Sequence, residues 1–343
     1  MAFRIALTDG SAAFEAGAGE TVLGAALRAG VDLPHACTLG GCGTCRVRVI
    51  EGTVGYDTFP LALSPQEAEE GYALACQAQP MENLVIEVPR VELAVPQRQQ
   101  AMVVDIEPYG AEVTHLSIVL PELASFAFRP GQHMNVFLED GSHRSFSMAS
   151  VPEGNALDFH IRRIAGGRFT DTALGTLQPG DMLDVELPHG TFRYHEEDYR
   201  QLVMVATGTG LAPIKCILES LMDDPDCPPV SLYWGMRTQA DLYLQDEIAA
   251  WRERLYDFRY VPVLSRADGG WEGRRGHVQQ AVLEDIPRFE DHAIYLCGSP
   301  RMIRDAKRDF GGAGASVDHV YVDGFNFQGA AGEALSRAAA GKE

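Results

Sequence analysis

The sequence predicts a multidomain α+β protein in which a small mixed-sheet domain, an antiparallel β-barrel and a parallel-sheet α/β domain follow one another. Three observations indicate this order: four cysteines in and after a glycine-rich loop near the N-terminus, a middle segment of short strands separated by glycine turns, and a C-terminal segment in which apolar strands alternate with helices. The length of 343 residues agrees, because a single hydrophobic core rarely extends beyond about 250–300 residues.

Four cysteines are candidate metal ligands. Cys37, Cys42 and Cys45 form a C-x4-C-x2-C pattern, and Cys76 supplies a fourth thiol. This spacing is typical of a plant-type [2Fe–2S] cluster, which four thiolates hold. Structural zinc is the alternative, but zinc ligands usually come in pairs that are two to four residues apart, so we favour the cluster. His35 is interpreted as a residue that shapes the loop rather than as a ligand.

Residues 1–92 have the elements of a small mixed sheet around this loop. The alternation of Val and Ile with polar residues at 46–51 has the period of a half-buried strand. Ser64, Pro65 and Glu67 predict the start of a short helix, because they supply a cap, a first-turn proline and a capping-box acid. The other expected elements are strands at 3–7 and 84–88 and a helix at 21–29. Together they indicate a β-grasp, ferredoxin-like domain.

The middle of the chain predicts an antiparallel barrel at residues 100–198, after a proline-containing linker at 93–99. Period-two runs at 134–138 and 157–161 are typical of half-buried strands. Turn dipeptides recur at regular intervals, at residues 130–131, 140–141, 153–154, 166–167 and 179–180. Many short strands with such turns favour a barrel over a helical domain.

Residues 199–327 have the βαβ pattern of a parallel sheet, because apolar strands alternate with helices. The expected strands lie at 202–206, 230–234, 260–264 and 293–296, and the expected helices at 213–222, 244–254 and 277–283. Residues 328–343 are rich in Gly and Ala and are interpreted as a flexible tail.

Two glycine-containing turns and one polar strand are candidate cofactor sites. The strand at 202–206 leads into Gly208-Thr209-Gly210, and a helix follows near Pro213, so a phosphate could approach backbone N–H groups at the helix start. A plain tight turn would also use these residues. In the barrel, the strand at 144–147 offers an arginine for a phosphate and a ring for stacking. The turn at 166–170 offers N–H groups and a hydroxyl to a pyrophosphate.

In this order the motifs resemble the ferredoxin–NADP⁺ reductase superfamily, in the form fused to an N-terminal plant-type ferredoxin domain. The resemblance covers residues 1–327 and also rests on the turn Cys297-Gly298-Ser299-Pro300. Such proteins are reductase components of bacterial multicomponent oxygenases. The segments look most like the reductases of terephthalate-type Rieske dioxygenases and of the CDP-6-deoxyhexose pathway.

The resemblance implies three cofactors, which are FAD, a [2Fe–2S] cluster and NAD(P)H, with NADH favoured over NADPH. It places the flavin at Arg144, Ser145, Phe146, Ser147, His160, Ile161, Arg162, Gly166, Gly167, Arg168, Phe169 and Thr170. It places the nicotinamide nucleotide at Gly208, Thr209, Gly210, Pro213, Arg237, Arg266 and Gly298. Cys297 beside the nicotinamide and Phe325 at the flavin face are the implied catalytic residues.

Two positions depart from the family pattern, and several have a purely structural alternative. Phe146 stands where the family usually has Tyr, so it keeps the ring and loses a hydroxyl. Asp323 stands where the family usually has Glu before the last aromatic residue. By residue type, Cys297 could equally be a packed core thiol, and Phe325 could simply cap the sheet. Arg266 could be a solvated surface residue.

The predicted function is a reductase component that passes electrons from NAD(P)H to FAD, to the cluster and to the terminal component of an aromatic-ring, Rieske-type oxygenase. A ferredoxin-like acceptor, a deoxysugar dehydrase or a diiron monooxygenase are alternative partners. Hydride carries two electrons and the cluster accepts one, so FAD stands between them. A non-catalytic electron carrier or a zinc-stabilised binding module is the competing class.

The composition narrows the class of partner. A formal net charge of −20 argues against nucleic acid and against anionic membrane surfaces. The N-terminal residues lack the pattern of a signal peptide, and no apolar stretch has the length of a membrane span. Four of the seven cysteines belong to the candidate cluster, and the other three, Cys216, Cys227 and Cys297, are scattered, so a disulfide framework is not expected. We therefore expect a cytoplasmic protein.

Overall fold

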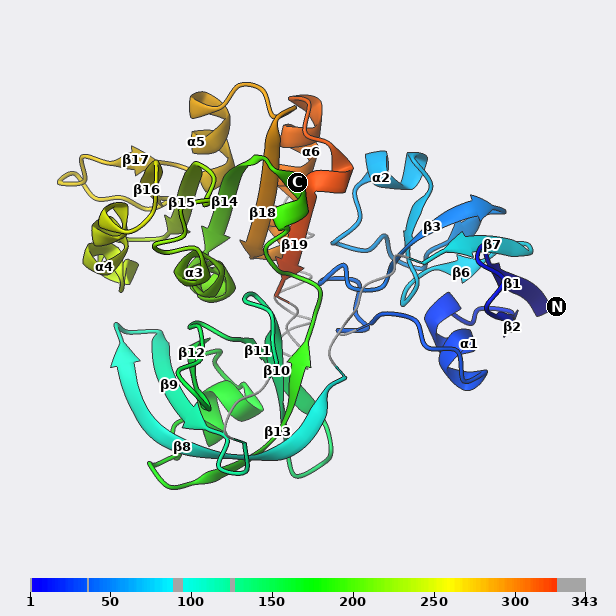
Figure 1. Cartoon of the computed structure of the whole chain (residues 1–343), viewed down its shortest axis with the longest axis horizontal. Coiled ribbons are helices and arrows are strands. Elements are labelled where there is room, and N and C mark those ends of the chain that lie inside the picture. Colours follow the sequence, from blue (N-terminus) through cyan, green and yellow to red (C-terminus); the bar gives the residue numbers. More distant parts are fainter. Residues whose placement is uncertain (1, 36, 89–94, 124–126, 326–343) are drawn as a thin grey trace.

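The computed structural model describes residues 2–35, 37–88, 95–123 and 127–325. Figure 1 shows three domains that meet near the centre of the molecule, each with its own sheet. The predicted series of a mixed-sheet domain, an antiparallel domain and a parallel-sheet domain is confirmed. The tail expected at 328–343 lies outside the described residues.

The N-terminal domain is a five-stranded mixed sheet packed against helix α1. Its strand order is β2-β1-β7-β3-β5, and β1 and β7 are parallel. Apolar side chains such as Ile5, Phe14 and Leu23 form its core. The predicted capping box of α2 is present at Ser64 and Glu67. The elements are β1 (Ala2–Leu7), β2 (Ala13–Gly17), α1 (Val22–Arg28), β3 (Arg46–Glu51), β4 (Val54–Gly55), α2 (Pro65–Glu69), β5 (Tyr72–Leu74), β6 (Gln79–Pro80) and β7 (Leu84–Glu87).

The middle domain is a six-stranded antiparallel sheet with the order β11-β10-β13-β8-β9-β12. A bridge between Met148 and Phe159 joins its two ends, so the sheet curls into the expected barrel. Strand β8 begins at Gln97, inside the segment expected to be a linker. The elements are β8 (Gln97–Tyr109), β9 (Val113–Val119), β10 (His133–Phe137), β11 (His143–Ser147), β12 (Ala156–Arg162), η1 (Arg168–Ala173), β13 (Met182–His189) and η2 (Glu196–Asp198).

The C-terminal domain is a six-stranded parallel sheet with the order β17-β16-β15-β14-β18-β19. Alternate residues of β14 face opposite cores, since Met204 packs with α3 and α4 and Val205 with α5 and α6. Helix α6 and strand β19 follow the last predicted strand. The elements are β14 (Gln201–Thr207), η3 (Gly208–Gly210), α3 (Leu211–Ser220), β15 (Val230–Met236), η4 (Gln239–Asp241), α4 (Gln245–Ala250), η5 (Trp251–Glu253), β16 (Phe258–Leu264), β17 (Arg274–Arg275), α5 (Val278–Asp285), β18 (His292–Gly298), α6 (Pro300–Gly312), η6 (Val317–His319) and β19 (Val320–Gly324).

A buried ion pair joins the N-terminal and C-terminal domains. Lys307 on α6 pairs with Glu67 on α2, and their side chains are only 5% and 1% exposed. The Lys307 ammonium also donates to the carbonyl of Ala62 at 2.9 Å. Arg46 lies 3.6 Å from the second oxygen of Glu67, so two cations face one carboxylate. A second contact, from the Tyr72 hydroxyl to Asp318 at 2.7 Å, lies at the rim of the same interface.

Candidate functional site

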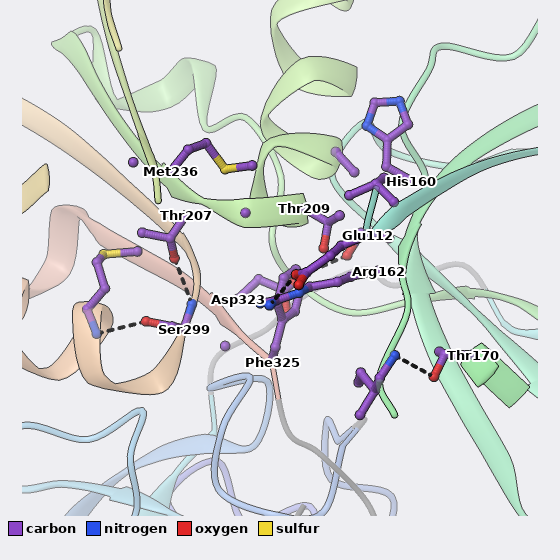
Figure 2. Close-up of a pocket in the computed structure, with 18 of the residues that line it drawn as sticks. Glu112, His160, Arg162, Thr170, Thr207, Thr209, Met236, Ser299, Asp323 and Phe325 are labelled. Atoms are coloured by element: carbon purple, nitrogen blue, oxygen red, sulfur yellow. Dashed lines mark hydrogen bonds and ion pairs between the residues drawn. The ribbon is translucent and has the colours of Figure 1, made fainter. Parts of the chain in front are cut away.

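A cavity of about 820 Å³ lies where the three domains meet. Its walls come from the cysteine loop, from strands β11 and β12 and turn η1 of the barrel, and from the carboxyl ends of β14, β15, β18 and β19. Figure 2 shows that Thr207, Ser299 and Met236 approach it from the parallel sheet, while Arg162 and Thr170 approach it from the barrel. In open parallel sheets, ligands bind outside the carboxyl ends of the strands, which is the edge that faces this cavity.

The four predicted metal ligands lie together in the N-terminal domain as two pairs, Cys37 with Cys42 and Cys45 with Cys76. Cys42, Cys45 and Cys76 are buried, and Cys37 is half-buried. The hydrogen bond from Cys42 and the backbone N–H groups aimed at its sulfur lower the pKa of Cys37 to about 5. The hydrogen bond from Cys45 likewise lowers the pKa of Cys76. Paired thiols with N–H donors fit a [2Fe–2S] cluster, because N–H groups stabilise anionic sulfur.

Strand β11 places the predicted flavin residues on one wall of the cavity. Arg144, Ser145, Phe146 and Ser147 all line it. The rings of Phe146 and Phe169 lie 5.1 Å apart, so the aromatic side chain of the strand is held by the turn that follows β12. The Ser145 hydroxyl donates to Asn135 on the neighbouring strand at 2.7 Å, which leaves the Phe146 ring and the Arg144 guanidinium as the larger groups at the wall.

The turn before η1 has the shape of a phosphate cradle. A Cβ atom on Gly167 would lie 2.3 Å from the Thr170 hydroxyl and 2.8 Å from the carbonyl of Ile164, so only glycine fits there. The N–H groups that begin a helical segment have no partner earlier in that segment and are available to an anion. Arg168 pairs with Asp140 at the edge of the cavity. The backbone N–H groups, the hydroxyl and the cation are groups that suit a pyrophosphate such as that of FAD.

The parallel sheet supplies a second turn to the cavity at the end of β14. Gly208 has a left-handed backbone with φ of 59°, and its carbonyl accepts a hydrogen bond from the indole of buried Trp234 at 2.9 Å. The Thr207 hydroxyl accepts from the N–H of Ser299 at 2.9 Å, which ties the end of β14 to the start of α6. Gly208, Thr209 and Ser299 line the cavity with their backbone groups close to the opening.

An ion-pair bridge crosses the cavity opening between barrel and parallel sheet. Arg162 on β12 pairs with Glu112 at 2.7 Å, and Arg237 after β15 lies 3.6 Å from the same carboxylate oxygen. Figure 2 shows Glu112 and Arg162 side by side. Two of the predicted cationic residues are therefore already partnered by an acid, and an anionic ligand would compete with Glu112 for them.

Asp323 is the buried acid of the site. Its carboxylate accepts a hydrogen bond from the Ser147 hydroxyl at 3.1 Å, which joins β19 to β11. Burial raises the pKa of Asp323 to about 7. Phe325 follows it into the cavity wall, and Figure 2 shows the two residues together at the end of β19.

The cavity brings most of the predicted cofactor residues together. Those at its wall are Arg144, Ser145, Phe146, Ser147, His160, Arg162, Gly166, Gly167, Arg168, Phe169, Thr170, Gly208, Thr209, Arg237 and Phe325. Five others support the wall from behind or lie beside it, and these are Ile161, Gly210, Pro213, Arg266 and Gly298. Cys297 is completely buried in the core of the parallel sheet, next to Asp323 in the β18–β19 register.

Several wall residues were not predicted. Tyr109, His133, His277 and Arg301 line the cavity with no motif to identify them, because each comes from a different part of the chain. His133 is buried, and burial lowers its pKa to about 3, so it faces the cavity as a neutral imidazole. Ser299 belonged to a predicted turn, and the Ser-Pro start of α6 is the signal that could have identified it.

Three family models match successive parts of the chain. A 2Fe-2S iron-sulfur cluster binding domain matches residues 7–81, an oxidoreductase FAD-binding domain matches 100–194, and an oxidoreductase NAD-binding domain matches 204–308. Each model covers the domain that contains the corresponding candidate site. Within the described residues, no helix is both long and apolar enough to span a membrane.

Proteins of similar sequence match over nearly the whole chain. The CDP-6-deoxy-L-threo-D-glycero-4-hexulose-3-dehydrase reductase of Yersinia pestis is 31% identical, over 95% of this chain and 99% of its own. Reductase component 2 of terephthalate 1,2-dioxygenase from Comamonas sp is 31% identical, over 95% and 98%. The xylene/toluene monooxygenase electron transfer component of Pseudomonas putida is 35% identical, over 91% and 90%.

A solved structure shares the three-domain arrangement. The cytochrome P450 reductase of Amycolatopsis superposes with a TM-score of 0.70 and is 30% identical. The match covers 94% of this chain and 98% of that one. The similarity therefore extends across all three domains rather than to one of them.

Proposed function

The chain belongs to the ferredoxin–NADP⁺ reductase family, in the form that carries an N-terminal [2Fe–2S] ferredoxin domain, and on that premise we propose which residues serve its electron transfer and which partner it reduces. It is an NAD(P)H-dependent flavin and iron–sulfur oxidoreductase of the kind that supplies electrons to oxygenase or dehydrase systems. We propose domain boundaries near residues 92 and 198, with Gln97–Gln99 belonging to the barrel.

One observation carries the assignment of the site. Two thiols of the cysteine loop, Cys37 and Cys42, line the same cavity as the barrel strand β11 and the turn that ends β14. Groups suited to a cluster, a flavin and a nicotinamide nucleotide thus face one space. When bound, FAD accepts the electron pair of a hydride and releases the electrons one at a time.

Different residues of the cavity would bind the flavin phosphates, contact its ring and hold a proton beside it. Arg144 would neutralise a flavin phosphate, and Gly167 with Thr170 would hold the pyrophosphate by backbone N–H groups and a hydroxyl. Phe325 and Phe146 would contact the flavin and limit the access of water to it. Ser147 and Asp323 form a hydrogen-bonded pair that can hold a proton at the Asp323 carboxyl beside the flavin site.

The nucleotide would enter along the carboxyl edge of the parallel sheet. Gly208 and Thr209 would receive its phosphates, and Arg237 would reach its ribose. Arg274 is held by Glu284 and Asp285, and Arg275 donates to the carbonyls of Asp268 and Trp271. Both arginines are candidates for the 2′-phosphate of NADPH and already have partners, as Arg237 has in Glu112, and these contacts support NADH over NADPH. Cys297 supports the nicotinamide site from the core rather than by direct exposure.

The partner we propose is the terminal component of an aromatic-ring, Rieske-type oxygenase. The similarity to the terephthalate 1,2-dioxygenase reductase over 98% of its length supports this class. The comparable similarity to a CDP-hexulose dehydrase reductase makes a deoxysugar dehydrase the second candidate. Anaerobic reconstitution of the purified protein with one terminal component of each class tests the choice. We expect NADH-dependent reduction of the oxygenase, and reduction of the dehydrase alone would contradict it.

A further inference from the structure

Three consecutive residues at the end of β19 each bond to a different domain. The carboxylate of Asp323 accepts from the Ser147 hydroxyl of the barrel at 3.1 Å. The N–H of Gly324 donates to the carbonyl of Gly41 in the cysteine loop at 3.2 Å. The N–H of Phe325 donates to the carbonyl of Gly298 in its own parallel-sheet domain at 3.0 Å. The end of this one strand therefore fixes the relative positions of all three sites.

Gly324 is the point of closest approach to the cysteine loop. A Cβ atom at this position would lie 2.5 Å from the Gly41 carbonyl oxygen and 3.3 Å from the Cδ1 atom of Ile303. Its backbone does not have the positive φ that requires glycine. The absence of a side chain is thus needed for the contact itself and not for the conformation of the strand.

The contact bears directly on the metal-binding loop. Gly41 precedes the ligand Cys42, and a Cβ on Gly43, on its other side, would lie 3.3 Å from the Cγ2 atom of Val322. Residues 322 and 324 of β19 therefore lie against both neighbours of Cys42. Meanwhile the buried ion pair of Lys307 and Glu67 holds the rest of the N-terminal domain against α6. A displacement at Gly324 has to be taken up by the loop.

We propose that Gly324 is a positioning residue that sets the distance between the cluster loop and the flavin site, and so the rate of electron transfer between them. The inference rests on the proposed function. In each transfer the reduced flavin loses one electron and the oxidised cluster gains it. Two transfers, with the partner reoxidising the cluster in between, return the flavin to its oxidised state and release the proton that arrived with the hydride. Because electron transfer slows steeply with distance, this step is the one that the contact controls.

The test compares Gly324→Ala with Gly312→Ala in the loaded protein. Gly312 lies at the end of α6, and no atom lies within 4 Å of the place that a Cβ atom would take there, so alanine at this position serves as the matched control. In anaerobic stopped-flow with NADH, Gly324→Ala should reduce its flavin at the normal rate and its cluster about tenfold more slowly. Hydrogen–deuterium exchange of the loop at residues 38–46 should accelerate in Gly324→Ala and not in Gly312→Ala.

The outcomes separate this inference from the proposed function. Normal cluster reduction in Gly324→Ala, with normal exchange in the loop, would overturn the positioning role. If the wild-type flavin never reduces the cluster, the proposed function itself fails. Should Gly324→Ala lose its cluster on purification, Val322→Ala replaces it, because it shortens the β19 side chain that packs against the N-terminal domain beside the cysteine loop, without adding atoms. Slower cluster reduction in Val322→Ala supports positioning of the cysteine loop by the end of β19, and an unchanged rate contradicts it.

Discussion

The parallel-sheet domain is packed against the ferredoxin domain and against the barrel by interfaces of opposite character. Toward the ferredoxin domain, the buried pair of Lys307 and Glu67 closes the interface. Toward the barrel, contacts such as Tyr243 to His160 at 3.3 Å and Ser147 to Asp323 at 3.1 Å surround a cavity of about 820 Å³. The first interface contains this buried pair, whereas the second surrounds the cavity in which we propose that the cofactors bind.

The two interfaces differ in how firmly they fix the relative position of the domains. A buried ion pair often stabilises an interface no better than well-packed apolar residues do, because burying the charges costs desolvation free energy. It does, however, form only when the two domains are in one relative position. The cysteine loop is bonded to β19 through Gly324 and Gly41, and a fixed register of the two domains keeps this bond in place. The barrel interface surrounds the proposed nucleotide site, and hydrogen bonds around a cavity suit the binding and release of a nucleotide.

We expect the largest effect when a cysteine ligand of the cluster in the ferredoxin domain is replaced. Cys76→Ser should remove the iron–sulfur absorbance and abolish NADH-driven cytochrome c reduction, because the cluster would lose one of its four thiolates. Ferricyanide reduction, which needs only the flavin, should survive, so the barrel side remains intact. Cys227→Ser, at a buried thiol of the parallel-sheet domain, is the control. An unaltered EPR signal of the reduced cluster in Cys76→Ser would remove Cys76 from the ligand set.

The second largest effect is expected at the interface between the ferredoxin domain and the parallel-sheet domain. Lys307→Met leaves the Glu67 carboxylate buried with Arg46 and the two Ser64 hydrogen bonds but without its ammonium partner, and removing one partner of a buried pair costs about 3–5 kcal/mol. Denaturant unfolding should show this loss. Arg308→Met, at the next and exposed position of α6, should cost little.

A double variant tests whether the loss of stability comes from the unpaired buried charge. Lys307→Met with Glu67→Gln should recover part of the lost stability, because no carboxylate then remains buried without the Lys307 ammonium, and glutamine can keep the capping box with Ser64. If the single and double variants unfold at the same denaturant concentration, the ion pair does not govern this interface.

The third effect lies on the cavity side. Arg144→Ala should weaken FAD binding by about tenfold to a hundredfold, since a hydrogen bond to a charged group contributes about 1.5–3 kcal/mol. Flavin fluorescence titration of the deflavinated protein measures it. Arg129→Ala, at an exposed position of the same barrel outside the cavity wall, is the control. FAD bound with normal affinity by Arg144→Ala would show that the barrel site is misassigned.

The smallest effect is a pH dependence at the junction of the two interfaces. Because burial raises the pKa of Asp323 to about 7, the folded protein keeps a proton that the unfolded chain releases above about pH 4. Stability is therefore lost as the pH rises from about 4 to about 7. Asp323→Asn cannot ionise, so its melting temperature relative to wild type should be higher at pH 8 than at pH 5. Asp291→Asn, at an exposed position, should follow wild type, and parallel curves for Asp323→Asn would contradict the raised pKa.

The sequence predicted the local features of each domain better than the contacts between the domains. The cysteine spacing, the Ser64 capping box and the Gly167 turn are determined within a few residues, and the structure has each of them. Lys307 and Glu67 are 240 positions apart, and no local pattern identifies such a pair. The burial of Cys297 likewise depends on β19, an element that periodicity did not reveal. Contacts between domains need the tertiary arrangement.

The order in which the flavin and the cluster are reduced shows whether electrons pass from NADH through the flavin to the cluster. Wild-type protein with FAD and cluster bound is mixed with NADH under anaerobic conditions, and the flavin and cluster absorbances are followed together, with EPR of frozen samples to identify the reduced cluster. The arrangement of the cavity predicts that flavin absorbance falls first and that the cluster is reduced afterwards at the expense of the flavin. Cluster reduction that precedes flavin reduction, or that proceeds at the same rate in protein stripped of FAD, would contradict it.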